Sequence, residues 1–180
     1  SVAGMALLRE TDRLLLTAFK FRFFEEVERA REIIQKGTLG RILHFRLMFG
    51  AFMPMAETWY ARRDLAGGGI IMDNGPHAVD LIRHLLGEIG GISACAGSFQ
   101  GIEVEDTAQL VVTLQSGAVG SVDLSWCAPV ASQSYLEIYG EEGTLLLDSK
   151  GISCRYRMWK DWKRTENRTG AKEAFARQIG

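Results

Sequence analysis

Four side chains capable of acid–base chemistry recur within residues 67–87, namely Asp73, His77, Asp80 and His84. Their spacings of four, three and four residues place them on one narrow stripe of a helix, because successive helical residues are rotated by about 100°. Histidine titrates near neutral pH, and a carboxylate within about 4–6 Å raises its pKa. A substrate hydroxyl lying over such a pair can lose its proton to His77, while Asp73 binds the substrate or orients the ring.

The same stripe has two other interpretations. Polar residues opposite an apolar helix face usually contact only water, although such faces are normally rich in Lys, Glu and Arg, and Asp and His are poor helix formers. Residues spaced by four can also share a metal ion, but the chain has no HExxH motif and no cysteine near the stripe. We therefore predict no metal site. His84, at the far end of the stripe, is predicted to be structural.

The elements around the stripe must hold it against the rest of the domain. The opposite side of the segment is expected to pack on a sheet and comprises Ile71, Gly75, Ala78, Ile82, Leu85 and Leu86. Three glycines, residues 67–69, precede the helix. Either they expose backbone amides to a phosphate, or they form a tight loop whose backbone closely approaches another segment. The chain contains neither GxGxxG nor a P-loop motif, so the glycines are not a nucleotide-binding fingerprint.

Short apolar and alternating segments predict the fold class. The predicted helix spans 24–37, and the predicted strands are 14–23, 41–50, 92–100, 107–115, 118–126, 134–140, 144–149 and 152–158. Val122, Leu124 and Trp126 alternate with polar residues, which gives a sheet with one apolar and one polar face. Because short glycine turns join consecutive strands, most should pair antiparallel. We therefore predict an α+β fold: an open, mostly antiparallel β-sheet with helices on one face.

Composition and charge narrow the class of protein. The 180 residues suit one domain, with 47% hydrophobic and 24% charged residues. A net charge of −1 argues against a nucleic acid as the binding partner. Residues 155–164, in which basic and aromatic side chains are interleaved, are therefore predicted to be an exposed strand end and loop. No apolar run is long enough to span a membrane. Three scattered cysteines indicate reduced thiols, so we expect a cytoplasmic protein.

Several motifs of the chain occur together in one known family. GGG is followed by the pattern DxxxHxxD and then by LLG within 67–87, and KFRF and KGTLGRI come earlier. Trp59 lies ahead of the glycines with Arg62 or Arg63, and EDTAQLVVTLQSGAVGSV and YGEEGTLLL follow them. In this order the motifs resemble the C-terminal domain of the glucose-fructose oxidoreductase/inositol dehydrogenase/MocA family. The resemblance covers nearly the whole chain.

The resemblance implies an oxidoreductase that transfers a hydride between NAD or NADP and a hydroxyl of a sugar, polyol or related compound. In such proteins the Asp/His face of this helix points at the nicotinamide and the substrate. His77 matches the usual general base, and Asp73 matches the acid that positions the substrate. The further residues implied are Trp59, Tyr60, Arg62, Arg63 and Asp80 for the substrate and Arg22 for the cofactor.

The resembling family also has an N-terminal Rossmann domain, which ends in an EKP motif with a lysine that the family uses. Neither feature occurs in this sequence. We therefore expect residues 1–180 to be a single substrate-binding and catalytic domain, a fragment without the dinucleotide-binding domain and inactive alone. The alternative is a non-enzymatic sugar-binding or oligomerisation module on the same scaffold.

The second face of the predicted sheet is expected to bind another subunit. Too few helical segments follow the quoted stretch to cover both faces, and the second face is not purely polar. Residues that could lie on it are Val111, Tyr135, Tyr139, Tyr156 and Trp159. A broad, partly apolar surface normally finds a partner. Since the resembling family packs this face against its own copy, we expect a homodimer or homotetramer.

Overall fold

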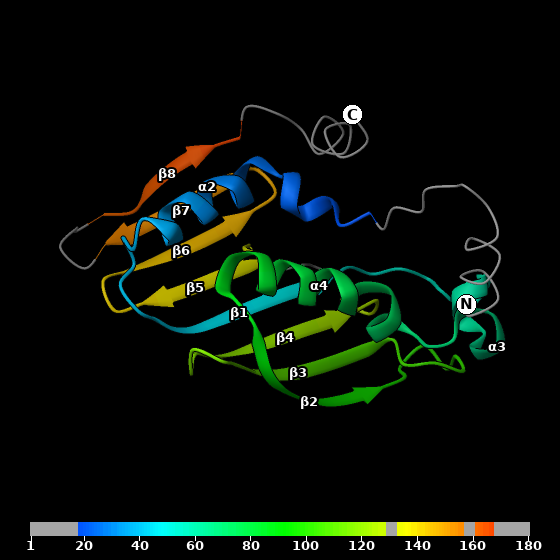
Figure 1. Cartoon of the computed structure of the whole chain (residues 1–180). Coiled ribbons are helices and arrows are strands. Elements are labelled where there is room, and N and C mark those ends of the chain that lie inside the picture. The colour runs from blue at the N-terminus through cyan, green and yellow to red at the C-terminus, as the bar shows by residue number, and fades with distance from the viewer. Residues whose placement is uncertain (1–17, 129–132, 157–160, 168–180) are drawn as a thin grey trace, which may run out of the picture.

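Eight described strands form one sheet in the order β2-β3-β4-β1-β5-β6-β7-β8, as a computed structural model shows (Figure 1). The structure describes residues 18–128, 133–156 and 161–167. The strands are β1 (Ile42–Gly50), β2 (Ile89–Gly97), β3 (Thr107–Leu114), β4 (Val119–Ser125), β5 (Leu136–Gly140), β6 (Gly143–Asp148), β7 (Gly151–Tyr156) and β8 (Lys163–Glu166).

Strand β1 joins the two halves of the sheet. It pairs in parallel with β4, where His44 faces Val119, and antiparallel with β5, where Phe45 faces Ile138. The other neighbouring strands are antiparallel and consecutive in sequence. The predicted mostly antiparallel sheet is therefore confirmed, and β1–β4 is the parallel pair among the described strands. A parallel pair needs a long crossover, which here contains the longest described helix and two strands.

One face of the sheet is buried because the strands alternate apolar and polar residues. In β4, Val122 and Leu124 are buried as predicted, and Trp126 just beyond the strand is only 1% exposed. On the neighbouring β1, Phe45 and Leu47 face the same core. The period of two in the sequence therefore identifies the core face correctly.

Helices α4 (Ile70–Leu86) and α2 (Glu25–Gln35) cover this buried face (Figure 1). Helix α4 packs on β1, β3 and β4, and α2 packs on β6 and β7. Ala78 and Ile82 on α4 are buried as predicted, while Ile71 remains partly exposed. No helix in the described ranges is long and apolar enough to cross a membrane. The shorter helices are η1 (Lys20–Phe23), η2 (Trp59–Ala61) and α3 (Arg63–Ala66).

The strand predicted at 14–23 is wrong for residues 20–23, which form η1, while residues 14–17 lie outside the described part of the chain. The aromatic residues that favoured a strand are used for tertiary packing instead. The ring of Phe21 stacks on that of Phe49, with centroids 4.7 Å apart. Phe21 therefore fixes η1 against the end of β1.

Strand β8 extends the sheet beyond β7 and was not predicted. Its four residues are all exposed, which agrees with the exposed position expected for the 155–164 segment, of which residues 157–160 lie outside the described ranges. The short charged sequence KRTE has no apolar alternation, so periodicity alone gives no sign of a strand there.

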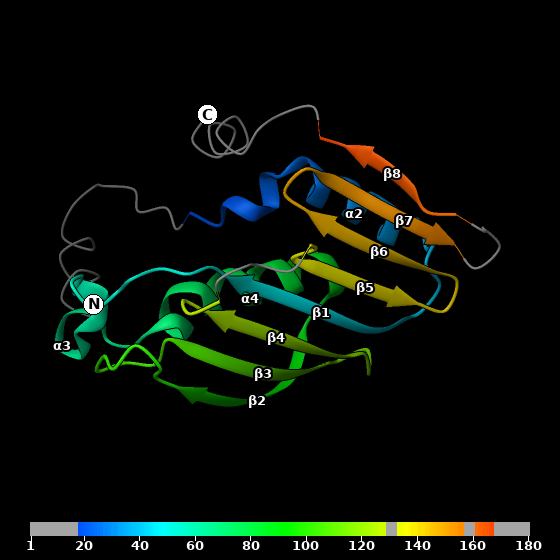
Figure 2. The ribbon, with the colours of Figure 1, turned by 180° about the vertical axis from the view of Figure 1, so that it is seen from behind.

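The far face of the sheet carries no helix among the described residues (Figure 2). Val111 is 58% exposed there and Val119 is 49% exposed. Tyr139 also lies on this face, where its ring stacks on that of His44 at 4.2 Å between centroids. Tyr135 does not, because its hydroxyl bonds to helix α2 on the covered face. Of the other residues expected on this face, Trp159 and the side chain of Tyr156 lie outside the part of the chain that the structure describes.

Candidate active site

The start of helix α4 is fixed by a close approach of two backbones. A Cβ on Gly69 would lie 1.8 Å from the carbonyl oxygen of Glu105, so only glycine fits. That oxygen accepts a hydrogen bond from the amide of Ile70 at 2.9 Å, and the Glu105 carboxylate accepts one from the amide of Gly69 at 2.9 Å. Of the two interpretations of the glycines, the tight loop is therefore the one observed, because Glu105 occupies amides that a phosphate would need. Sequence reasoning missed Glu105.

A cavity of about 190 Å³ lies beside the first turns of α4. Asp73 lines it from the helix, and Trp59 and Tyr60 line it from η2, with their rings stacked 3.9 Å apart. Trp59 is 53% exposed, so part of its ring remains available to a ligand. The structure thus brings together three of the predicted site residues, a carboxylate and two aromatic rings. The remaining lining residues are Ala66, Gly68, Gly69 and Met72.

His77 lies one turn beyond Asp73 and is half-buried between aromatic rings. Its ring makes edge contacts with Phe19 and Phe21, at centroid distances of 6.0 and 5.8 Å. Burial lowers the pKa of His77 below 6.5, and the charge of Lys20 lowers it further, although Asp73 and a second acid on α4 act in the opposite direction. The expectation that a nearby carboxylate raises this pKa is therefore wrong in its net effect, since desolvation of the imidazolium dominates.

Asp80 is 8% exposed and is bound by Arg22 instead of facing the cavity. The Nε of Arg22 lies 2.8 and 3.0 Å from the two carboxylate oxygens, and Nη2 lies 2.5 Å from one of them. This hydrogen bonding raises the pKa of Arg22. The prediction that the whole stripe lies away from the core is therefore wrong at Asp80, which is buried. A buried carboxylate needs a partner, and Arg22 of η1 provides it. The pair ties η1 to the middle of α4.

The predicted pocket residues Arg62 and Arg63 do not line the cavity. Arg62 Nη2 donates to the carboxylate of Asp64 at 2.9 Å. Arg63 donates from Nη2 to the carbonyl oxygen of Glu103 at 2.7 Å and from its amide to the carboxylate of that residue at 3.0 Å. Both arginines therefore hold α3 and its neighbouring loop in place.

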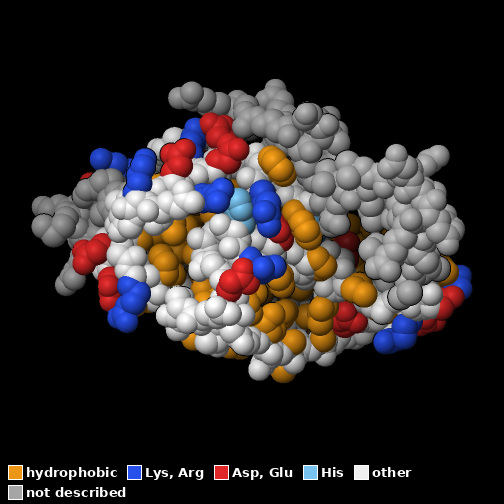
Figure 3. All heavy atoms as spheres, viewed as in Figure 1, with side chains coloured by type: hydrophobic (Ala, Val, Ile, Leu, Met, Phe, Trp, Pro, Cys, Tyr) orange, Lys and Arg blue, Asp and Glu red, His pale blue; other side chains and the backbone are white. Residues whose placement is uncertain are grey.

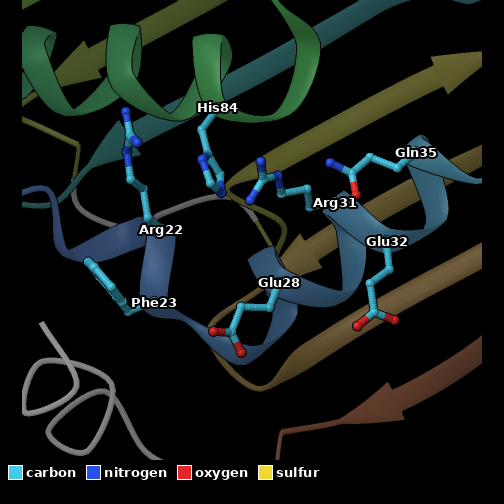
Figure 4. Close-up of a pocket in the computed structure, with 7 residues that line it drawn as sticks. All are labelled: Arg22, Phe23, Glu28, Arg31, Glu32, Gln35 and His84. Atoms are coloured by element: carbon cyan, nitrogen blue, oxygen red, sulfur yellow. The ribbon is translucent and has the colours of Figure 1, made fainter.

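His84 faces a second, larger cavity on the other side of Asp80. This cavity, of about 520 Å³, lies between α2, η1 and the C-terminal half of α4 (Figure 4). Asp73 and His84, at the two ends of the stripe, therefore line two different cavities, and Arg22, the partner of Asp80, lines the larger one. No group of three or more His, Cys, Asp or Glu side chains in the described ranges is placed to hold a metal ion.

Comparison with known proteins places this geometry in a family. The model of the GFO/IDH/MocA C-terminal domain matches residues 27–146. Levoglucosan dehydrogenase from Pseudarthrobacter phenanthrenivorans is 26% identical over 163 residues, covering 74% of this chain and 42% of that protein. Myo-inositol 2-dehydrogenase from Thermotoga maritima is 28% identical over 149 residues, covering 78% of this chain and 43% of that protein. The chain spans less than half the length of these relatives.

Solved structures share the fold. A levoglucosan dehydrogenase in complex with NADH and levoglucosan superposes with a TM-score of 0.76 at 24% identity, covering 83% of this chain and 46% of that one. An NAD binding oxidoreductase from Klebsiella pneumoniae gives a TM-score of 0.76 at 25% identity, covering 88% and 48%. The family match spans most of the chain and includes all of α4 with Asp73 and His77. The chain therefore belongs to the GFO/IDH/MocA family, of which it carries the C-terminal domain.

Proposed function

We propose that this chain is the substrate-binding and catalytic domain of an NAD- or NADP-dependent oxidoreductase acting on a hydroxyl of a sugar, polyol or related compound. The observation that carries the proposal is that Asp73 lines a cavity walled by stacked aromatic rings, while His77 does not line it but lies one turn further along α4. Aromatic faces pack well on the apolar faces of sugar rings, and a carboxylate accepts hydrogen bonds from their hydroxyls. The relatives named for levoglucosan and myo-inositol support the same substrate class.

His77 is suited to act as the general base. Its lowered pKa keeps the imidazole neutral at pH 7, so the ring can accept a proton. Its Nδ1 is buried and has no hydrogen-bond partner among the described residues, so we assign Nε2 to the substrate. In the oxidation the alcohol carbon loses a hydride, its hydroxyl loses a proton to His77, and a carbonyl forms. Asp73 holds the substrate, and a bound nicotinamide supplies the hydride acceptor.

Arg22 is the described residue that we propose to face the cofactor. Its side chain is still 43% exposed although it binds Asp80, and a guanidinium suits the polar and anionic groups of a dinucleotide. Most contacts with NAD or NADP would come from a separate dinucleotide-binding domain, and this chain covers only 42% and 43% of the two relatives. The chain alone should therefore neither bind nor reduce NAD measurably.

The test is a pair of substitutions on helix α4 in the complete enzyme. His77→Ala should lower kcat/KM for the sugar or polyol by about 10² to 10⁴-fold, as expected when a general base is lost. Arg83→Gln is the matched control, because Arg83 is exposed on the same helix and pairs only with Glu88 among the residues described. Activity of the His77 variant within about twofold of the control would refute the assignment.

We also propose that the open sheet face binds a second copy of the chain, giving a homodimer or homotetramer. Val111 and Val119 expose 58% and 49% of their surface there, and apolar side chains on a broad flat face favour association. A stable contact should bury more than about 1,000 Å² in total. Light scattering at micromolar concentration tests this, and a 20.0 kDa monomer would contradict it.

We further propose that the protein works in a reducing compartment such as the cytoplasm. Cys95, Cys127 and Cys154 are all in the described part of the chain, and none forms a disulfide there. Cys95 is exposed, which an oxidising compartment would not favour. Fractionation of the native cells would test the location.

A further inference from the structure

The larger cavity contains two basic side chains, Arg31 and His84, to which the proposed function gives no role, beside Arg22, which we propose to face the cofactor. It has a volume of about 520 Å³, within the range of small-molecule sites. It opens on the helical face of the molecule, where Figure 3 shows a histidine flanked by basic side chains. Its lining residues are Arg22, Phe23, Glu28, Arg31, Glu32, Gln35 and His84.

Three basic side chains from three different helices converge at this cavity. Figure 4 shows the His84 ring extending from α4 between the guanidinium groups of Arg22 and Arg31, with the Gln35 amide directed toward the same place. Arg22 binds Asp80 through Nε and Nη2, which leaves Nη1 available. Arg31 makes no hydrogen bond with another described residue. The cavity thus offers the N–H donors of Arg31 and His84 together with Nη1 of Arg22, whose other donors bind Asp80.

The arrangement places two guanidinium groups beside a partly buried histidine, and one of them, Arg22, is already paired with Asp80. Burial lowers the pKa of His84, and the charges of Arg31 and Arg22 lower it further, while the charge of Asp80 acts in the opposite direction. Two carboxylates also line the cavity, but Figure 4 shows those of Glu28 and Glu32 directed away from the convergence point. An anion placed between the two guanidinium groups could accept charge-assisted hydrogen bonds from both of them.

We propose that this cavity binds the phosphoryl group of a small molecule, held by Arg31, His84 and the free Nη1 of Arg22. Arginine presents its donors in a planar fork that matches phosphate oxygens, and a phosphate has enough oxygens to accept from all three side chains. The volume exceeds that of a bare phosphate, so there is room for an attached polar body, with Gln35 as a further donor. The ligand is thus either free phosphate or a phosphate monoester.

The proposed phosphoryl site lies in a different cavity from the proposed substrate site, although Arg22, which contributes Nη1 to it, is also the residue proposed to face the cofactor. The two cavities share no lining residue. His84 lies seven residues after His77, which is about 10 Å along the helix at 1.5 Å per residue. A sugar hydroxyl at His77 and a phosphoryl group at His84 could therefore be bound at the same time.

The experiment is calorimetric titration of the purified protein with inorganic phosphate and with ribose 5-phosphate, at constant ionic strength. A dissociation constant on the order of 1 mM or tighter is expected for at least one of them. Arg31→Gln should weaken this binding at least tenfold, because it removes one charged donor from an exposed helix position where folding is not at risk. Arg41→Gln is the matched control, since Arg41 is an exposed arginine that pairs with Glu141 elsewhere in the fold, and it should bind as the wild type does.

The outcomes separate the possible sources of the phosphoryl group. Equal binding of both probes through Arg31 identifies free phosphate, and tighter binding of the ester identifies a phosphorylated metabolite. Competition by NAD would show that the phosphates are those of the cofactor and would overturn a separate site. Absence of binding up to about 50 mM, or an Arg31→Gln variant that binds like the Arg41→Gln control, would also overturn it.

Discussion

Substituting Gly69 by alanine should break the contact that fixes the start of helix α4. The added Cβ would lie 1.8 Å from the carbonyl oxygen of Glu105, 2.7 Å from its carbonyl carbon and 2.9 Å from its nitrogen. These are backbone atoms, so no side chain can rotate out of the way. The two segments must separate, and the first turn of α4 moves together with Asp73.

The magnitude follows from the bonds that such a separation breaks. The Gly69 amide donates to the Glu105 carboxylate at 2.9 Å, and a hydrogen bond to a charged group contributes about 1.5–3 kcal/mol. The Ile70 amide donates to the Glu105 carbonyl at 2.9 Å, and a neutral bond contributes about 0.5–1.5 kcal/mol. The free energy of unfolding should therefore fall by about 2–4 kcal/mol, a large share of the roughly 5–15 kcal/mol of a typical domain.

Urea denaturation provides the assay, with Gly75→Ala as the matched control on the same helix. A Cβ on Gly75 meets only Ile71 Cγ2 at 3.6 Å, an ordinary contact, and alanine is favoured over glycine in a helix by roughly 1 kcal/mol. With an m-value of about 2 kcal/mol/M, Gly69→Ala should lower the midpoint by about 1–2 M, and Gly75→Ala should leave it equal or higher. A Gly69→Ala midpoint equal to that of wild type would refute the reasoning.

Three further predictions concern protonation and packing. The folded-state pKa of His77 is below 6.5, so its contribution to the free energy of unfolding is complete above pH 6.5 and is lost as the pH falls through the folded-state pKa. In urea denaturation at several pH values, His77→Gln should lack this pH-dependent loss of stability. Glu26 is 2% exposed and accepts a hydrogen bond from the Tyr135 hydroxyl at 3.0 Å, and burial raises its pKa. Glu26→Gln should therefore leave the free energy of unfolding at pH 7 nearly unchanged, whereas Glu26→Leu should lower it by about 2–3 kcal/mol in urea unfolding. A Cβ on Gly120 would lie 2.4 Å from ring atoms of Phe45, so Gly120→Ala should lower the Tm by overpacking, at a cost of about 1–3 kcal/mol, and calorimetry with an unchanged Tm would contradict this.

Local pattern was enough to predict most elements of this fold. The period of 3.6 in residues 70–86 and the alternation in 118–126 each reflect one face packed on a core, and that is a property of neighbouring residues. The parallel pairing of β1 with β4 could not be predicted in this way, because His44 and Val119 are far apart in the chain. The strand prediction failed at residues 20–23 for a related reason, because the apolar ring of Phe21 packs on Phe49 of another element and does not belong to an alternating strand.

In the candidate site, too, features set by neighbouring residues were predictable and contacts between distant segments were not. The spacing of Asp73 and His77 correctly places them one turn apart on a helix, which depends only on helical geometry. The partners that control the site come from distant segments. Arg22 covers Asp80, and the Glu105 backbone fills the loop before α4, and no local pattern connects these pairs. The roles of the site residues in catalysis and cofactor binding stay predictions until the substitutions are measured.

The position of β1 between two antiparallel halves has a consequence for the order of folding. Strands β2–β4 and β5–β8 can each form from short hairpins, whereas pairing His44 with Val119 closes a loop of about 75 residues. Relative to a loop of about 10 residues, this closure costs roughly 2 kcal/mol more in chain entropy, so β1 should insert late, which φ-values in β1 near zero would reveal. Helix α4 packs on both β1 and β4. The groups at Asp73 and His77 therefore reach their final geometry at the step that joins the two halves, and a half-formed sheet presents no assembled site.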